Sequence, residues 1–369
     1  MKQTLGLYIH IPFCKAKCAY CDFYSLARSE GRMDAYVAAL ISSLRAAAPD
    51  AAAYAVDTVY FGGGTPSFLG AERLAALLEA VFDCFAVAPD AEITLEANPE
   101  SARDASALRT LRGAGFNRIS LGMQSADEQE LRAIGRIHTA RDTEAAVETA
   151  RAAGFDNLSL DLIYGLPSQT RERWRGNLAA AAALAPEHLS CYGLKVEPGT
   201  MLYARRDSIA LPDDDAQADM YLDAVEYLAV QGYAQYEISN FARPGRESRH
   251  NLKYWTLGEY LGFGPGAHSD FGGRRFAVAR ELDAFLAGEA MYSESSVITP
   301  RERAAERVML GLRLTRGLPS DELAGAETVL RACTAHGLAE QNGGRWRLTP
   351  QGFLVSNAII LRVQEALGL

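Results

Sequence analysis

Residues 8–23 read YIHIPFCKAKCAYCDF, an apolar strand-like run followed at once by three cysteines, Cys14, Cys18 and Cys21. Their spacing is C-x3-C-x2-C, and the chain of 369 residues has only six cysteines, so random placement does not explain the group. Thiolates are the usual protein ligands of iron–sulfur clusters, whose iron favours soft sulfur donors. The segment therefore favours a metal-cluster site at the end of a first strand.

The number of cysteine ligands indicates which kind of cluster the site would hold. A four-iron cluster needs one ligand for each iron, and three thiolates leave one iron open to a substrate or cofactor. A structural zinc site would need a fourth Cys or His, for which His10 is the nearest candidate; zinc stays open, as do cysteines without any metal. Cys84, Cys191 and Cys333 lie in apolar stretches and are interpreted as buried hydrophobic residues.

Short apolar runs alternate with longer Ala-rich amphipathic stretches from residue 5 to about residue 193. Such repetition predicts a parallel sheet with right-handed crossovers. Six units fit either an open doubly wound sheet or an incomplete barrel, and periodicity does not decide between them. We expect strands at 5–11, 58–61, 92–96, 118–121, 157–162 and 188–193, and helices at 33–47, 71–85, 104–112, 127–153 (broken near Ile137) and 170–184.

The remainder of the chain changes character. A helix is expected at 213–231 and a strand at 234–239, followed by a Gly- and aromatic-rich region at 240–276. Beyond residue 300, helices are expected at 302–313, 321–323, 328–336 and 352–365, with a hairpin at 338–348 that turns at 342–344. This order is typical of a winged helix. The segment has nine Arg and no Lys against seven Asp and Glu, so an accessory docking domain is favoured over a DNA-reading one.

Composition excludes several classes of function. The net charge of −9 disfavours a nucleic-acid partner, which normally requires a basic field. No apolar run reaches about 18 residues, and no secretory apolar segment follows Met1. We therefore expect neither a membrane span nor export, and predict a cytosolic protein.

The three cysteines, with Tyr20 just before the last of them, resemble the signature of radical S-adenosylmethionine (SAM) proteins. In that family the amino and carboxylate groups of SAM bind the open iron of a [4Fe–4S] cluster. The resemblance implies both cofactors. It also implies a partial (β/α)6 barrel, which decides between the two architectures left open by periodicity.

Polar residues and glycines follow successive expected strands. The run GGGTP lies at 62–66, Glu96 ends the third strand, Gln124 follows the fourth and Asp161 lies in the fifth. Ligands of parallel α/β folds lie outside the carboxyl ends of the strands, and glycines there let backbone approach a ligand closely. Each residue alone is commonly a turn or cap residue. Together they suit SAM, whose cationic groups and ribose hydroxyls need carboxylate or carbonyl partners.

Five further motifs resemble the core of oxygen-independent coproporphyrinogen III oxidase and its paralogues, over nearly the whole chain. The motifs are YIHIPFC at 8–14, YFGGGTPSFL at 60–69, LEANPE at 95–100, SLGMQS at 120–125 and DLIYGLPSQT at 161–170. Arg136 is assigned by its spacing from Gln124 rather than by a distinctive motif. The resemblance implies SAM contacts by Tyr8, Tyr20, Gly63, Gly64, Thr65, Glu96, Gln124, Arg136 and Asp161.

Two features depart from the oxidase. The oxidase has a further cysteine two residues after the third, where this sequence has Phe23. The oxidase also has a longer N-terminal extension that helps to cover its substrate, whereas here only a few residues precede the first expected strand. Both departures disfavour decarboxylation of coproporphyrinogen.

A second motif, HNLKYW at 250–255, resembles the HNxxYW hallmark of haem chaperones of the HemW type. Neutral imidazole is a common axial ligand of haem, and aromatic rings pack on porphyrin faces. His250 is therefore the candidate haem contact, although a hydrogen-bonded loop histidine is the plainer interpretation. His268, in GPGAHS at 264–269, is a second histidine for which a loop or core role is favoured.

The resemblance predicts a cytosolic haem chaperone that binds haem, transfers it to an apo haem protein and holds a SAM-binding [4Fe–4S] cluster without established catalytic turnover. The alternative is a radical SAM oxidoreductase acting on coproporphyrinogen III or another tetrapyrrole, for which a flavodoxin or ferredoxin is the expected reductant. A SAM-binding regulator acting on nucleic acid is disfavoured by the acidic charge. The predicted organisation is a radical SAM core at 1–240, a connecting region with the HNxxYW motif at 241–299 and the accessory domain at 300–369.

Overall fold

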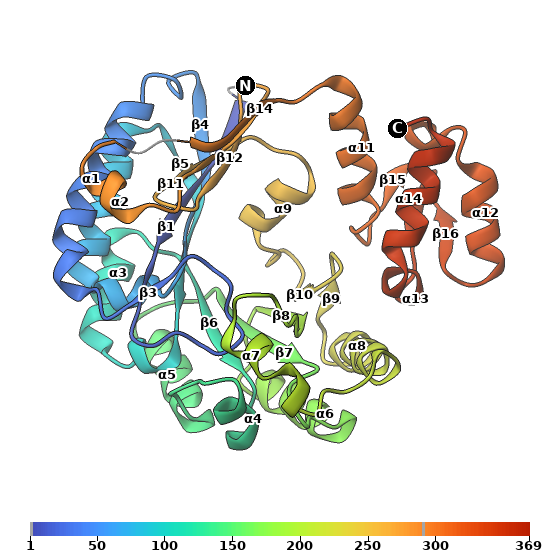
Figure 1. Ribbon diagram of the computed structural model, residues 1–369, viewed down its shortest axis with the longest axis horizontal. Coiled ribbons are helices and arrows are strands. Elements are labelled where there is room, and N and C mark those ends of the chain that lie inside the picture. Colours follow the sequence, from blue (N-terminus) through green and yellow to red (C-terminus); the bar gives the residue numbers. More distant parts are fainter. Residues whose placement is uncertain (1–2, 290–291) are drawn as a thin grey trace.

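The computed structural model describes residues 3–289 and 292–369, and its main body is built on one curved sheet (Figure 1). Six strands of this sheet are parallel and stand in their sequence order. The last of them does not pair with the first, so the sheet is a partial barrel, which confirms the predicted (β/α)6 architecture. The strands are β1 (Gln3–Ile11), β4 (Tyr54–Gly63), β5 (Val87–Ala97), β6 (Arg118–Gln124), β7 (Leu158–Tyr164) and β8 (His188–Gly193).

Helices cover the convex face of the barrel and follow the strands as predicted (Figure 1). Their apolar sides pack with the outward residues of the strands in one continuous core. The helix expected at 127–153 is broken, because Gly135 turns with a φ of 75°. The helices are α1 (Met33–Ala47), α2 (Ala71–Cys84), α3 (Ala105–Ala114), α4 (Glu128–Ala133), α5 (Ala140–Ala152) and α6 (Arg171–Ala183).

Short strands extend the sheet beyond both edges of the barrel. The expected strand at 234–239 is wrong in extent, since only β9 (Ala234–Gln235) forms before the chain turns into β10 (Asn240–Ala242), which pairs antiparallel with β8. On the other edge, four strands that the sequence analysis did not predict continue from β1. They are β11 (Tyr260–Phe263), β12 (His268–Phe271), β13 (Arg274–Val278) and β14 (Tyr292–Val297).

The helices of the region between β8 and β14 are α7 (Met201–Ala204), α8 (Asp214–Val230), α9 (Arg249–Trp255) and α10 (Leu282–Leu286). The long helix α8 confirms the helix predicted at 213–231, and Asp213 caps its first turn. The HNxxYW motif forms α9, which Ser248 caps through its hydroxyl. Among the described residues, no helix is both long and apolar enough to cross a membrane.

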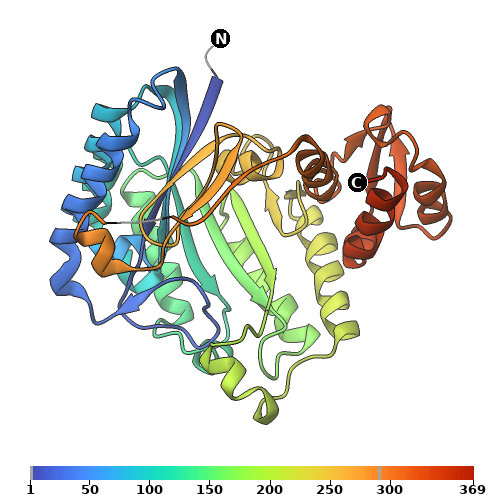
Figure 2. The same cartoon turned by 45° about the horizontal axis from the view of Figure 1, so that its top comes forward.

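The C-terminal domain begins at α11 (Pro300–Gly311) and has its own apolar core around Leu330, Trp346 and Val363 (Figure 2). The predicted hairpin is confirmed: Asn342 pairs with Arg345, and the two glycines between them have positive φ, as a tight hairpin turn requires. The other elements are β15 (Leu318–Pro319), the 3-10 turn Asp321–Leu323, α12 (Glu327–Ala335), β16 (Ala339–Asn342), β17 (Arg345–Leu348), α13 (Pro350–Leu354) and α14 (Ser356–Ala366).

The C-terminal domain is attached to both edges of the partial barrel. On the β12 side, the buried carboxylate of Asp270 accepts hydrogen bonds from Arg275 at 2.9 Å and from both terminal nitrogens of Arg303 at 2.7 Å. On the β8 side, the Thr315 amide donates to the Tyr236 carbonyl at 3.1 Å, and Tyr221 of α8 joins the core of the domain. One domain therefore bridges the two edges that the open sheet leaves apart.

We expect Asp270→Asn to lower the free energy of unfolding by about 1.5–3 kcal/mol, because hydrogen bonds to a charged group are lost and two guanidinium groups lose their shared counter-charge. Urea unfolding followed by circular dichroism measures the change. Glu322→Gln, which removes the exposed ion pair with Arg307, is the matched control and should cost less than about 1 kcal/mol. Equal losses in the two variants would contradict the anchoring role of Asp270.

Candidate functional site

The cysteines lie on a loop that is fastened to the barrel rim at several points. The loop closes on itself through the short strands β2 (Phe13–Cys14) and β3 (Leu26–Ala27), which pair in parallel. His10 Nε2 bonds to the Tyr24 carbonyl at 2.8 Å, and the Ala19 amide donates to the Ile134 carbonyl at 2.9 Å. The three thiols are thus held at the carboxyl ends of the parallel strands.

The glycines after β4 explain how this loop lies so close to the sheet. The Gly64 amide donates to the Ile11 carbonyl and the Thr65 amide to the Phe13 carbonyl, both at 2.8 Å. A Cβ atom at Gly64 would lie 2.9 Å from these carbonyl oxygens. Gly63 has a φ of 113°, and a Cβ there would lie 2.5 Å from the His10 ring. The sequence analysis attributed these glycines to ligand approach, and the structure adds the packing of the cysteine loop as a steric reason.

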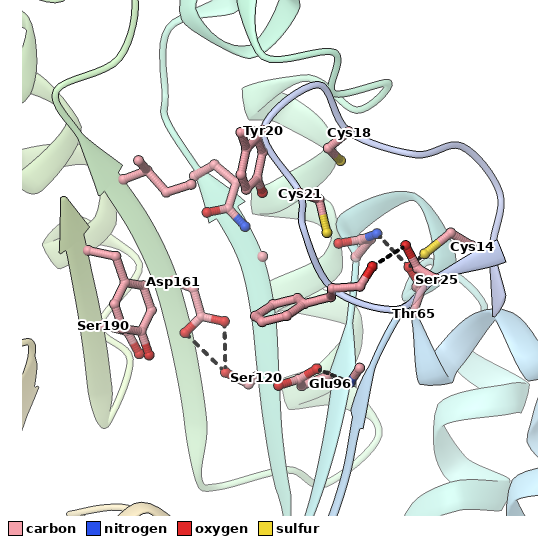
Figure 3. A pocket seen from close by; sticks show the side chains of 18 of the residues that line it. Cys14, Cys18, Tyr20, Cys21, Ser25, Thr65, Glu96, Ser120, Asp161 and Ser190 are labelled. Atoms are coloured by element: carbon pink, nitrogen blue, oxygen red, sulfur yellow. Dashed lines mark hydrogen bonds between the residues drawn. The ribbon is translucent and has the colours of Figure 1, made fainter. Parts of the chain in front are cut away.

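A cavity of about 500 Å³ opens beneath the cysteine loop, inside the barrel (Figure 3). Every predicted site residue lines it except Tyr8 and His250. Figure 3 shows the thiols at one side of the cavity and the carboxylates of Glu96 and Asp161 below them, on strands β5 and β7, which flank β6. The predicted residues that line the cavity are Cys14, Cys18, Tyr20, Cys21, Gly63, Gly64, Thr65, Glu96, Gln124, Arg136 and Asp161.

The surroundings of the sulfur atoms suit a polynuclear cluster. Thr65 Oγ1 donates to Cys14 Sγ at 3.5 Å and Arg136 Nη1 to Cys18 Sγ at 3.3 Å, contacts that favour thiolates. Burial raises the pKa of the Cys14 and Cys21 thiols above the usual range, so the free thiols are protonated. Among the described residues, no three Cys, His, Asp or Glu side chains converge on a single metal ion. A four-iron cluster needs no such convergence, since it binds each thiolate at a different iron.

Arg136, which the sequence analysis placed by spacing alone, connects three parts of the site. Its Nη2 donates to Asn98 Oδ1 at 2.8 Å and to the Gly122 carbonyl at 2.5 Å, while Nη1 reaches Cys18. A Cβ at Gly122 would lie 2.5 Å from this nitrogen, so a glycine is required there. The Nε atom of Arg136 is buried and has no partner within the part of the chain that the structure describes. A cation is therefore fixed beside the cysteine loop.

Two carboxylates of the cavity, those of Glu96 and Asp161, have hydrogen-bond donors but no ion-pair partner within 4 Å among the described residues. Glu96 accepts from the Tyr60 hydroxyl at 2.7 Å and from the Gly63 amide at 3.1 Å, and burial raises its pKa to about 7. Asp161 accepts from the Ser120 hydroxyl at 3.1 Å, and burial raises its pKa as well. Both groups are placed to accept hydrogen bonds from an amine or from hydroxyl groups of a ligand.

Tyr20 and Gln124 line the cavity by different means. Tyr20 packs on the small apolar cluster of Ile134, Ile163 and Leu166, which fixes the middle of the cysteine loop. Gln124 ends β6 with a φ of 64°, next to an irregularity in the pairing of β6 and β7. This left-handed conformation is uncommon for a residue other than glycine and is typical of functional positions.

Tyr8 lies outside the cavity lining. Its hydroxyl bonds to His10 Nδ1 at 3.1 Å, and its ring stacks on Tyr60 with centroids 6.2 Å apart. Tyr60 in turn donates to Glu96, so Tyr8 contacts the cavity residues indirectly, through Tyr60. A direct contact between Tyr8 and SAM stays a prediction.

His250 is fully buried, and both of its ring nitrogens are hydrogen-bonded. Nδ1 bonds to Thr58 Oγ1 at 2.9 Å and Nε2 to the Tyr254 hydroxyl at 2.7 Å. Burial, with Lys253 and Arg118 nearby, lowers its pKa to about 3, so the ring is neutral. In this arrangement haem ligation by His250 would require Nε2 to exchange its partner, and the contact stays a prediction. His268 is an exposed residue of β12.

Sequence reasoning missed the deeper lining of the cavity. Arg118, Ser120 and Gly122 alternate along β6 with the apolar residues Ile119, Leu121 and Met123, which enter the outer core. This period of two was visible in the sequence, because a strand with polar residues at every second position has one polar face. Other lining residues that were not predicted are Asn98, Ser190, Tyr192, Lys195, Glu197 and Asn251.

Two family models match separate parts of the chain. The family model of the Radical SAM superfamily matches residues 8–179, and that of the HemN C-terminal domain matches residues 298–355. Among solved structures, coproporphyrinogen III oxidase (HemN) from Escherichia coli, described as a radical SAM enzyme, superposes with a TM-score of 0.85 at 26% identity, over 98% of this chain and 90% of the oxidase.

Curated relatives match over almost their full length. The Heme chaperone HemW of Mycobacterium tuberculosis is 41% identical, over 97% of this chain and 94% of that protein. The Heme chaperone HemW of Escherichia coli is 38% identical, over 96% of this chain and 97% of that protein. The chain therefore belongs to the radical SAM superfamily and, within it, to the HemW family.

Proposed function

We propose that this protein is a cytosolic haem chaperone that binds haem and transfers it to an apo haem protein. The observation that carries the proposal is the near full-length similarity to relatives named heme chaperones. The position that the oxidase fills with a fourth cysteine is Phe23 here, and its side chain is 63% exposed beside the cysteine loop. An apolar residue in that place supports a role other than that of the oxidase.

We further propose that Cys14, Cys18 and Cys21 hold a [4Fe–4S] cluster and that the cavity binds SAM. When bound, the cluster supplies an open iron for the amino and carboxylate groups of SAM. Glu96 would accept a hydrogen bond from the amino group and Asp161 from the ribose hydroxyls, which fits their lack of ion-pair partners. Arg136 would stabilise the thiolate of Cys18.

The alternative is a radical SAM oxidoreductase that acts on coproporphyrinogen III or another tetrapyrrole and takes electrons from a flavodoxin or ferredoxin. The close structural match to the oxidase favours it. Anaerobic reconstitution followed by parallel assays of haem binding, SAM cleavage and coproporphyrinogen III conversion decides between the two. Tight haem binding without conversion supports the chaperone, and conversion at useful turnover would overturn it.

Cys18→Ser is expected to lose the cluster, because an iron would be left without its thiolate and Arg136 without its sulfur partner. Iron and sulfide analysis after anaerobic reconstitution, together with the visible absorption of the cluster, measures the loss. Cys333→Ser in the C-terminal domain is the matched control and should bind as much iron as the wild type. A full cluster in Cys18→Ser would remove this cysteine from the ligand set.

SAM affinity is expected to fall as the pH drops from 8 to 6. The pKa of Glu96 is raised to about 7 without ligand, and a donor on SAM favours the ionised carboxylate, so a proton must leave on binding. This residue then contributes up to about tenfold in Kd for each pH unit below 7. Equilibrium binding should show a shallower slope for Glu96→Gln than for the wild type. Glu197→Gln, which alters another carboxylate of the lining, should keep the wild-type slope.

His250→Ala is expected to weaken haem binding and change the Soret spectrum, if the neutral ring replaces Tyr254 by haem iron at Nε2. Tyr254→Phe frees Nε2 and should bind haem at least as tightly as the wild type. His268→Ala, which alters an exposed histidine, serves as the control. Unchanged affinity and spectrum in His250→Ala would remove His250 from the haem site.

A further inference from the structure

The guanidinium of Arg118, at the start of β6, has no partner in the part of the chain that the structure describes. The side chain is only 1% exposed and lines the cavity. It forms neither an ion pair nor a hydrogen bond to any described residue, and its Nε is buried without an acceptor. A buried guanidinium whose donors have no acceptor is costly, so a fold that keeps one is expected to use it.

The acceptors around Arg118 are occupied by other donors. Glu92, its strongest negative neighbour, accepts from the amides of Arg249 and His250, both at 3.0 Å, and so caps α9. Asp161 accepts from Ser120. Neither carboxylate lies within 4 Å of the guanidinium as an ion-pair partner.

Another neighbour of Arg118 is the buried side chain of His188. His188 bonds to Ser159 Oγ at 2.8 Å and to the Tyr236 hydroxyl at 2.8 Å. Burial and the charge of Arg118 hold its pKa below the usual range, so the ring is neutral. Arg118 therefore lies among groups whose hydrogen bonds are made with other residues, and the open side of its surroundings is the cavity.

Arg118 lies deeper in the cavity than the cysteine loop does. Gly122, beside Arg136, and Arg118 lie four residues apart on the same face of β6, which is about 13 Å of strand. The two buried arginines thus stand at different depths of one cavity. Asn251 of the HNxxYW motif lines the same cavity.

We propose that Arg118 is the anchor for a carboxylate of the cargo, a propionate of the bound tetrapyrrole, in the deep part of the cavity. The inference rests on the proposed haem-binding function and names the group through which the protein recognises its ligand. Arginine is suited to this task, because its planar fork binds a carboxylate through two parallel hydrogen bonds. The carboxylate of the ligand is then the ion-pair partner that Arg118 lacks in the ligand-free protein.

The experiment compares haem with haem dimethyl ester, in which both propionates are masked, on the reconstituted full chain. The wild type should bind haem about 10- to 100-fold more tightly than the ester, the range expected for a hydrogen-bonded charge pair. Arg118→Gln should lose this preference by weakening haem binding alone. Arg109→Gln, on the exposed side of α3, should keep it. The thermal unfolding midpoint of ligand-free Arg118→Gln should stay close to that of the wild type, because the change removes no hydrogen bond or ion pair to a described residue.

Three results would overturn the proposal. One is equal affinity of the wild type for haem and its ester, which needs no variant at all. Another is an Arg118→Gln protein that is markedly less stable without ligand, which would make the guanidinium structural. The third is an Arg118→Gln protein with unchanged haem binding but weakened SAM binding, which would identify the carboxylate as that of SAM. If the wild type binds neither tetrapyrrole, the haem-binding function itself fails, whereas the other results leave that function standing.

Discussion

The close contact between the end of β4 and the end of β1 is the constraint on which the site depends. Two backbone hydrogen bonds, from Gly64 and Thr65 to the carbonyls of Ile11 and Phe13, hold the cysteine loop against the sheet. They form only because glycines leave room for the crossing chain. Any side chain at Gly64 would push the loop outward, and the thiols would move away from Thr65 and Arg136. The positions of the three thiols are therefore set by residues about fifty positions further along the chain.

Much of the barrel could be predicted from the sequence because its elements are long and regular. The helix at 33–47 and the strand at 188–193 have the predicted bounds. The extension β11–β14 was missed, because its strands are short, and glycines at 264, 266, 272 and 273 interrupt the first three, so no apolar alternation is long enough to detect. The strand predicted at 234–239 was wrong in extent, since the chain reverses there to form β10.

The prediction of the site had a similar limit. Residues at the strand ends were found by the rule that ligands bind there, and the structure brings them together in one cavity. Arg118 was missed because it lies at the start of its strand, where that rule gives no signal. His250 was chosen for its chemistry, but only the structure shows that Thr58 and Tyr254 occupy both ring nitrogens. Partners from distant parts of the chain are not visible in a single motif.

The C-terminal domain contributes no residue to the cavity lining, yet it is attached to the sheet on both sides of the barrel's open seam. It connects the two edges of the open barrel. The separation of β1 and β8 is then constrained by this domain, whose own core lies outside the barrel, as well as by the sheet. A protein that docks on this domain and tilts it would widen or narrow the seam without touching the cluster loop. Access to the cavity through that seam would thereby depend on the position of a domain that lies outside the barrel.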